Sequence, residues 1–227
     1  MQNKIFLPLA IIIAGGLIAG ALYFGGNGDR VSNDAEEPSF EKMSPVSEGD
    51  HIFGNPSAPI KLVEYSDTQC PYCRAFHQTM KMLMADFAPE GKVAWVYRHF
   101  AILGPESVTE AHATECAADQ GGNEMFWKFI DAMFTAKNDN ARFPVSASIE
   151  TVAKGVGLDM EKFRTCQESR KFEEKILAER QNAANAGAQG TPYTLIVNAK
   201  NEPMAVIPGA LPYESAKQVV EEALKNI

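Results

Sequence analysis

The sequence lacks an excess of basic residues: 21 lysines and arginines stand against 29 aspartates and glutamates, and the net charge is −8. A broad basic surface for nucleic acid is therefore not expected. Only four cysteines and four histidines occur, with no second C-x-x-C motif and no zinc-finger spacing of histidines, so a structural zinc site has little support. The chain has no internal repeat. Its 227 residues fit one domain with appendages.

Charge is also absent from one long apolar run, Ile5–Phe24. A helix needs about 20 apolar residues to cross a hydrocarbon core of roughly 30 Å. Lys4 precedes the run and acidic residues follow it, which favours a cytoplasmic segment at residues 1–4 and an exported remainder. We expect residues 5–24 to be a transmembrane signal anchor in the cytoplasmic (inner) membrane. The alternative is a signal peptide cleaved near Ala19–Ala21, which would release the protein to the periplasm.

Residues 25–50 contain few large apolar side chains and are rich in glycine, serine, proline and acid. Such a segment buries too little surface to offset the entropy lost on ordering. We expect a flexible linker there and a folded domain over residues 51–227.

The domain alternates strand and helix patterns before and after a long helical block. Apolar runs at 60–65 and 92–100 predict buried strands, with a helix from Cys70 to about Phe87 between them. Further predicted helices cover 107–120, 125–135, 149–155, 160–168 and 171–186, followed by strands at 193–198 and 205–207 and a closing helix at 213–226. This order predicts an α/β domain with an all-helical insertion at about 105–187.

The motif Cys70-Pro71-Tyr72-Cys73 lies between a predicted strand and a predicted helix. A helix N-terminus favours negative charge, so it lowers the pKa of a thiol placed there and makes it a nucleophile. Two intervening residues let the second sulfur reach the first across one helical turn. The pattern predicts a reversible dithiol–disulfide centre. The alternative is not an enzyme: it is a module that binds a metal ion through this motif without catalytic turnover.

Four motifs resemble the DsbA family of exported oxidoreductases with a thioredoxin fold. They are VEYSDTQCPYCRAFH, VYRHFAIL, AADQGGNEMFWKF and GTPYTLIVN, and they occur in the order of that family. The resemblance covers residues 51–227 and implies a thioredoxin-like fold. It also implies that Cys70 is the exposed nucleophile and Cys73 its more buried partner.

The same resemblance implies supporting roles for three further residues. Pro192 is expected to be a cis-proline facing the disulfide, with the backbone of Thr191 available to an extended substrate segment. Glu64 matches a buried acidic position where it assists proton transfer; the alternative is an ordinary carboxylate with a salt-bridge partner. Pro71-Tyr72 departs from the Pro-His of the strongly oxidising members and resembles glutaredoxins, so thiol exchange is better supported than oxidising power.

The expected activity is the introduction of disulfides into reduced, unfolded exported proteins, with no cofactor and no metal. A disulfide reductase or isomerase that uses the same centre is the alternative. Turnover implies a membrane partner linked to quinone, of the DsbB or VKOR type. Cys116 and Cys166 both fall in the helical insertion, where we expect a structural disulfide; the alternatives are two separate buried thiols and, less favoured, a regulatory or relay role.

Overall fold

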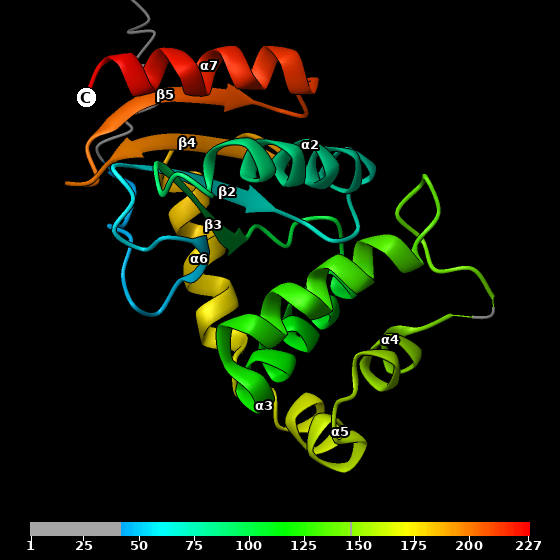
Figure 1. The fold of residues 1–227 in the computed structure, drawn as a ribbon. Coiled ribbons are helices and arrows are strands. Elements are labelled where there is room, and N and C mark those ends of the chain that lie inside the picture. The colour runs from blue at the N-terminus through cyan, green and yellow to red at the C-terminus, as the bar shows by residue number, and fades with distance from the viewer. Residues whose placement is uncertain (1–41, 146) are drawn as a thin grey trace, which may run out of the picture. The chain divides into compact units, whose positions relative to one another are not determined.

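The computed structural model describes residues 42–145 and 147–227, drawn in Figure 1. Apart from the first strand, its elements follow the order that the sequence predicted. In chain order they are β1 His51–Gly54, β2 Ile60–Ser66, α2 Pro71–Phe87, β3 Val93–His99, α3 Pro105–Ala136, α4 Ile149–Val156, α5 Met160–Ser169, α6 Glu173–Asn185, β4 Tyr193–Asn198, β5 Pro203–Pro208 and α7 Tyr213–Lys225.

The strands form a mixed sheet in the order β1-β3-β2-β4-β5. β2 and β3 run parallel, joined by α2 as the crossover, whereas β1, β4 and β5 each pair antiparallel with a neighbour. All residues of β2 and β3 are buried, because helices cover both faces of the sheet. The central strand β2 carries Glu64 and leads directly into the Cys70 motif.

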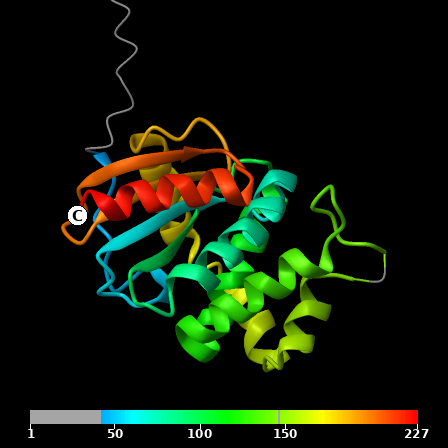
Figure 2. The same ribbon diagram turned by 45° about the horizontal axis from the view of Figure 1, so that its top comes forward.

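Two hydrophobic cores lie on the two faces of the sheet. On one face α2 and α7 pack side by side (Figures 1 and 2). Leu62 of β2 belongs to the same core as Phe76 and Met80 of α2. On the other face α6 packs against β3, and Val63 contributes to a core with Ala183. Alternation along β2 therefore directs Leu62 and Glu64 toward α2, and Val63 away from it.

Helices α3 to α6 form the insertion between β3 and β4. The two helices that the sequence predicted at 107–120 and 125–135 are the two halves of α3. They meet at a kink where Gly121 and Gly122 leave helical geometry, and Gly122 has a φ of 65° that favours glycine. The first half packs with α4 and α5 on a third core. The second half contributes Phe126 and Trp127 to the core under α2, and Phe129 and Met133 to the third core.

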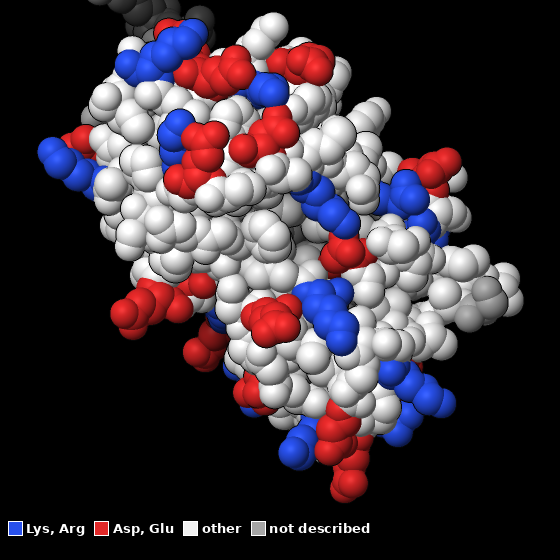
Figure 3. All heavy atoms as spheres, viewed as in Figure 1, with Lys and Arg blue, Asp and Glu red and all other residues white. Residues whose placement is uncertain are grey.

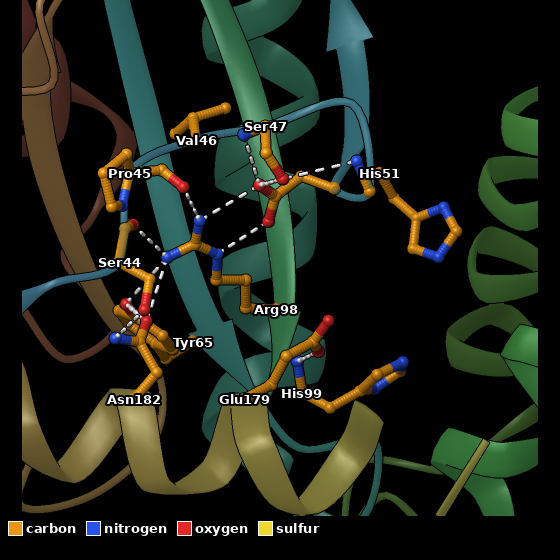
Figure 4. Close-up of polar contacts among 12 residues, drawn as sticks. Ser44, Pro45, Val46, Ser47, His51, Tyr65, Arg98, His99, Glu179 and Asn182 are labelled. Atoms are coloured by element: carbon orange, nitrogen blue, oxygen red, sulfur yellow. Dashed lines mark hydrogen bonds and ion pairs between the residues drawn. The ribbon is translucent and has the colours of Figure 1, made fainter. Parts of the chain in front are cut away.

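The ordered domain begins before residue 51, so the linker expected over 25–50 is wrong for its last residues. Met43 is buried against the sheet. Arg98 of β3 pairs with Asp50 at 2.7 Å and donates to the backbone carbonyls of Ser44 and Pro45 (Figure 4). The sequence pattern missed this contact because its partners lie about fifty residues apart, and it also missed the short edge strand β1.

The transmembrane anchor expected at residues 5–24 and the remainder of the linker lie outside the described residues. Within 42–145 and 147–227, helices are too short or too polar to cross a bilayer. Basic and acidic side chains are interspersed on the face shown in Figure 3, which carries no extended basic patch.

Candidate active site

The candidate site is built where the sheet meets the N-terminus of α2. Cys70 is the N-cap residue, with extended backbone angles, and Pro71 occupies the first helical turn. Proline fits there because the first amides of a helix have no intrahelical acceptor. The Cys70 sulfur therefore lies beside unpaired amides and the positive end of the helix dipole.

The surroundings of Cys70 favour its thiolate and lower its pKa to about 6. The largest contribution is a hydrogen bond donated by the Cys73 thiol; the Thr191 side chain and the backbone amides of Tyr72 and Cys73 add to it. Burial opposes the shift without cancelling it. At neutral pH most of this cysteine is ionised, and a thiolate is the nucleophilic form.

Cys73 has the opposite character. Its side chain is fully buried, and burial, together with the neighbouring Cys70 and Glu64, raises its pKa well above 9.0. The backbone N–H of Asp67 donates to its sulfur at 3.5 Å. One cysteine is thus held as a thiolate and the other as a thiol, which is the pairing that dithiol–disulfide exchange requires.

Cys70 is less exposed than the sequence suggested, because only 4% of its surface reaches solvent against 0% for Cys73. The expectation of an exposed nucleophile is therefore wrong in degree: Cys70 packs at the edge of the core under α2. The exposed residue of the motif is Tyr72, at 69%. Its backbone amide, and not its ring, contributes to the pKa of Cys70.

Glu64 lies on β2 beneath the dithiol and is 1% exposed. Its carboxylate accepts a hydrogen bond from the indole N–H of Trp95 at 2.8 Å. Burial raises its pKa to about 7, and a Cys70 thiolate adds to the shift. No lysine or arginine pairs with Glu64 among the described residues, so the salt-bridge alternative lacks a partner. A buried carboxyl that titrates near neutrality can accept or donate a proton at physiological pH.

The loop before β4 closes the site from the opposite side. The Thr191–Pro192 peptide bond is cis. The Cys70 sulfur lies 3.4 Å from the Thr191 carbonyl oxygen, to which the thiol donates when it is protonated, so the start of α2 lies beside this loop. Pro192 is buried and Thr191 half-buried.

The sequence interpretation missed Asp67, which organises the turn into α2. One carboxylate oxygen accepts the backbone N–H of Gln69 at 2.8 Å, and the other accepts the backbone amides of Ile102 and Leu103 at 2.9 and 3.1 Å. The contact with Gln69 is an Asx turn, in which an aspartate side chain accepts the backbone N–H two residues later. An aspartate just before a predicted helix is the sequence signal that could have indicated it.

A buried ion pair beneath the same turn was also missed. Lys137 binds Glu110 and donates to the Thr68 carbonyl at 2.8 Å; Glu110 in turn accepts hydrogen bonds from the side chains of Thr68 and Gln69. The pair spans α3 and lies far from Cys70 in sequence, so no local pattern signals it. It fixes the two residues that precede the N-cap.

Cys116 of α3 and Cys166 of α5 form a disulfide across the insertion, apart from the candidate site. Cys70 and Cys73 are the free cysteines of the described chain.

The mixed sheet, the dithiol at the start of α2 and the cis-proline opposite it together define a class: thioredoxin-fold domains with a dithiol–disulfide centre. The family model described as thioredoxin matches residues 46–221, so the chain belongs to the thioredoxin family. The thioredoxin-like fold expected from the motifs is confirmed.

Known relatives fall into two groups. A probable disulfide bond formation protein D from Bacillus anthracis is 24% identical over 99% of both chains. The Na(+)/H(+) antiporter NhaA 3 of Salinispora tropica is 31% identical over 73% of this chain, which spans only 24% of the antiporter's length. Among solved structures, Wolbachia pipientis alpha-DsbA1 has a TM-score of 0.69, with 22% identity and coverage of 83% of this chain and 96% of that one.

Proposed function

We propose that this protein is an exported thiol–disulfide oxidoreductase that introduces disulfide bonds into extracytoplasmic proteins. The observation that carries the proposal is the unequal pair at the start of α2: the pKa of Cys70 is about 6, whereas that of Cys73 is raised well above 9.0. A stabilised thiolate favours the reduced enzyme, so its disulfide tends to pass to a substrate. The name of the Bacillus anthracis relative supports the same direction.

In the proposed reaction, a substrate thiolate attacks the Cys70 sulfur of the Cys70–Cys73 disulfide. A mixed disulfide forms, and Cys73 leaves as a thiolate that takes up a proton, for which Glu64 is the nearby buried acid. A second substrate thiolate then attacks the substrate sulfur of the mixed disulfide, so that Cys70 leaves as its stabilised thiolate. The substrate has gained a disulfide and the enzyme is reduced.

The activity is tested by refolding a reduced, denatured disulfide protein with the oxidised full-length chain. Wild type should restore substrate activity, and Cys70→Ser should abolish it. The matched control is the Cys116→Ala/Cys166→Ala double variant, which should retain turnover because its disulfide lies apart from α2. Full activity in Cys70→Ser would refute the proposal.

The direction of net reaction is tested by the reduction potential of the Cys70–Cys73 couple in glutathione buffers. A value near that of DsbA, about −120 mV, supports oxidation, whereas one near that of thioredoxin, about −270 mV, would favour the reductase alternative. The lowered pKa of Cys70 favours the first outcome; the absence of a histidine cation in Pro71-Tyr72 favours a less oxidising value than that of DsbA.

We further propose the placement of the domain outside the cytoplasm, tethered by residues 5–24 in the cytoplasmic membrane, with residues 25–41 as the linker. The uncharged run and the charges on either side of it support this placement. A quinone-linked membrane protein of the DsbB or VKOR type is the proposed reoxidant. Resistance of the full-length protein to alkaline extraction from membranes, with an intact N-terminus by mass spectrometry, tests the anchor against cleavage.

A further inference from the structure

The disulfide of the insertion has a chemical asymmetry that a purely structural bond would not need. Cys116, in the middle of α3, exposes none of its surface, whereas Cys166 is 7% exposed and lines a cavity of about 750 Å³. An incoming thiol can therefore approach the Cys166 side of the bond. Thiol exchange requires such access to one of the two sulfurs.

His112 lies on the other side of the bond, one helical turn before Cys116. Its Nδ1 atom is 3.4 Å from the Cys116 sulfur, and the residue is 4% exposed. The backbone N–H of Phe172 donates to the other ring nitrogen, Nε2, at 3.3 Å. A neutral imidazole that accepts at Nε2 carries its proton on Nδ1, so the N–H of His112 is directed at the Cys116 sulfur.

The protonation state of His112 agrees with this arrangement, because burial lowers the pKa of the imidazole although hydrogen bonds with the Gln167 side chain and the Arg170 backbone oppose the shift. The ring is thus neutral at pH 7, with one proton to donate. A buried thiolate without a donor is costly, and a hydrogen bond to a charged acceptor is worth more than one to a neutral acceptor. His112 therefore stabilises Cys116 as the leaving group when the disulfide opens.

We propose that Cys116–Cys166 is a second thiol–disulfide exchange site, separate from Cys70–Cys73, which small-molecule thiols open by attack on Cys166. The thiolate of the small thiol forms a bond to the Cys166 sulfur while the Cys116–Cys166 bond breaks. Its electron pair passes to Cys116, which leaves as a thiolate held by the Nδ1–H of His112. A second small thiol then attacks the sulfur of the first, which releases a small disulfide and leaves both cysteines reduced.

The cavity beside Cys166 limits the size of the thiol that can attack it. Cys166 lines the cavity between α3 and α5, together with Gln120 and Lys162. A tripeptide thiol such as glutathione fits a space of this volume, whereas a cysteine of a folded protein has to bring its neighbouring residues into the same space. This site is independent of the proposed oxidation of protein substrates at Cys70.

The test uses the full-length chain with Cys70→Ser and Cys73→Ser, so that Cys116 and Cys166 are its remaining cysteines. The oxidised protein is incubated with reduced glutathione, quenched with acid, alkylated and digested for mass spectrometry. Glutathione is expected on Cys166 with an alkylated Cys116, at a rate that rises in proportion to the thiolate concentration. A glutathione adduct on Cys116 would overturn the proposal. So would an opening rate that is independent of glutathione and equal to the rate of global unfolding.

The role of His112 is tested by two substitutions in the same background. His112→Phe removes the N–H donor and should slow opening about tenfold, a modest value for a hydrogen bond to a charged group. His112→Asn keeps an N–H close to the Nδ1 position but loses the acceptor for Phe172, and it should restore most of the rate. Equal rates for wild type and the phenylalanine variant would show that His112 only fills space, against the proposal.

The source of the thiol is distinguished by a second arm with a reduced, folded thioredoxin in place of glutathione. Opening by glutathione but not by the protein thiol, at equal thiolate concentration, supports a small-molecule site. Faster opening by the protein thiol would contradict it. The experiment that locates glutathione on Cys166 or Cys116 uses no His112 variant. It therefore tests the proposal even if His112→Phe does not fold.

Discussion

At the scale of single residues, the core beneath α2 holds three acids whose pKa values are shifted in different directions. Cys70 is shifted down to about 6, Cys73 up well above 9.0, and Glu64 up to about 7. Cys70 has hydrogen-bond donors for its anion, whereas burial dominates at the other two. The two cysteines are chemically identical, so it is their different surroundings that make the Cys70 sulfur the nucleophile.

The Cys70 shift predicts the pH dependence of alkylation. In the reduced protein, the rate with iodoacetamide should rise through a midpoint near pH 6. Cys73→Ala removes the largest contribution to that shift, so the midpoint should move up toward 9.0. A midpoint in the variant equal to that of wild type would show that the helix terminus alone sets the pKa. Mass spectrometry of the alkylated peptide assigns the reacting residue.

Glu64 predicts a change of stability with pH. Its folded pKa, about 7, lies above the ordinary 4.5, so its contribution to stability is complete below pH 4.5 and is lost as pH rises through 7. In the Glu64→Gln variant the side chain at this position cannot ionise. Relative to wild type, the variant should gain up to about 3 kcal/mol of unfolding free energy between pH 4 and pH 8.

Urea unfolding of both proteins in a Cys70→Ala background across this range measures the difference without the coupled titration of Cys70. A difference that stays constant with pH would place the pKa of Glu64 at its ordinary value. The same variant should slow substrate oxidation if Glu64 supplies the proton that Cys73 takes up.

At the scale of elements, the start of α2 is held in place from the helical insertion. The ion pair of Lys137 and Glu110 joins the end of α3 to the turn of Thr68 and Gln69, and Arg142 donates to the Gln69 carbonyl at 3.2 Å. The insertion therefore supports the geometry of the N-cap as well as covering the sheet.

Breaking this ion pair from one side predicts a large loss of stability. Lys137→Met leaves Glu110 buried without its cation, which should lower the unfolding free energy by about 3–5 kcal/mol. Adding Glu110→Gln should recover much of the loss, because the unpaired charge is then gone. Urea unfolding of both single variants and the double variant gives the coupling energy; additive losses would mean that the two side chains act independently.

The sequence predicted elements whose signal is local and missed contacts whose partners are distant. β2, β3 and β4 are apolar runs, and the capping and apolar spacing of the helices are visible in the chain, so their bounds were found within a few residues. The edge strand β1 is short and half exposed, which leaves it without a clear period. The anchoring of Asp50 by Arg98 and the burial of Cys70 depend on tertiary packing that no local pattern encodes.

At the scale of the whole described domain, the insertion carries a core of its own, which groups residues of α3, α4 and α5 around the Cys116–Cys166 disulfide. α3 links this core to the one under α2, because its second half, after Gly121–Gly122, contributes Phe126 and Ile130 to the core under α2 and Phe129 and Met133 to the insertion core. The disulfide closes a loop with a sequence separation of 50.

Removal of that bond predicts a loss of stability. In the chain-entropy account, a loop of this length stabilises by about 4 kcal/mol, so Cys116→Ala/Cys166→Ala should unfold at correspondingly lower urea concentration. Equilibrium unfolding of the double variant and of wild type in urea, analysed with the same m-value, measures the difference in unfolding free energy. Wild-type stability in the variant would mean that packing of α5 on α3 suffices without the bond.

The near-complete enclosure of Cys70, at 4% exposure, acts as a steric filter on what the nucleophile can meet. Ionisation makes the sulfur reactive, but the residues packed around it limit which substrates can reach it. A thiol on a single extended segment approaches a recessed sulfur with fewer steric clashes than a thiol on a flat, folded surface. Selectivity for chains that have not yet folded would then arise from shape alone, before any side chain of the substrate is recognised.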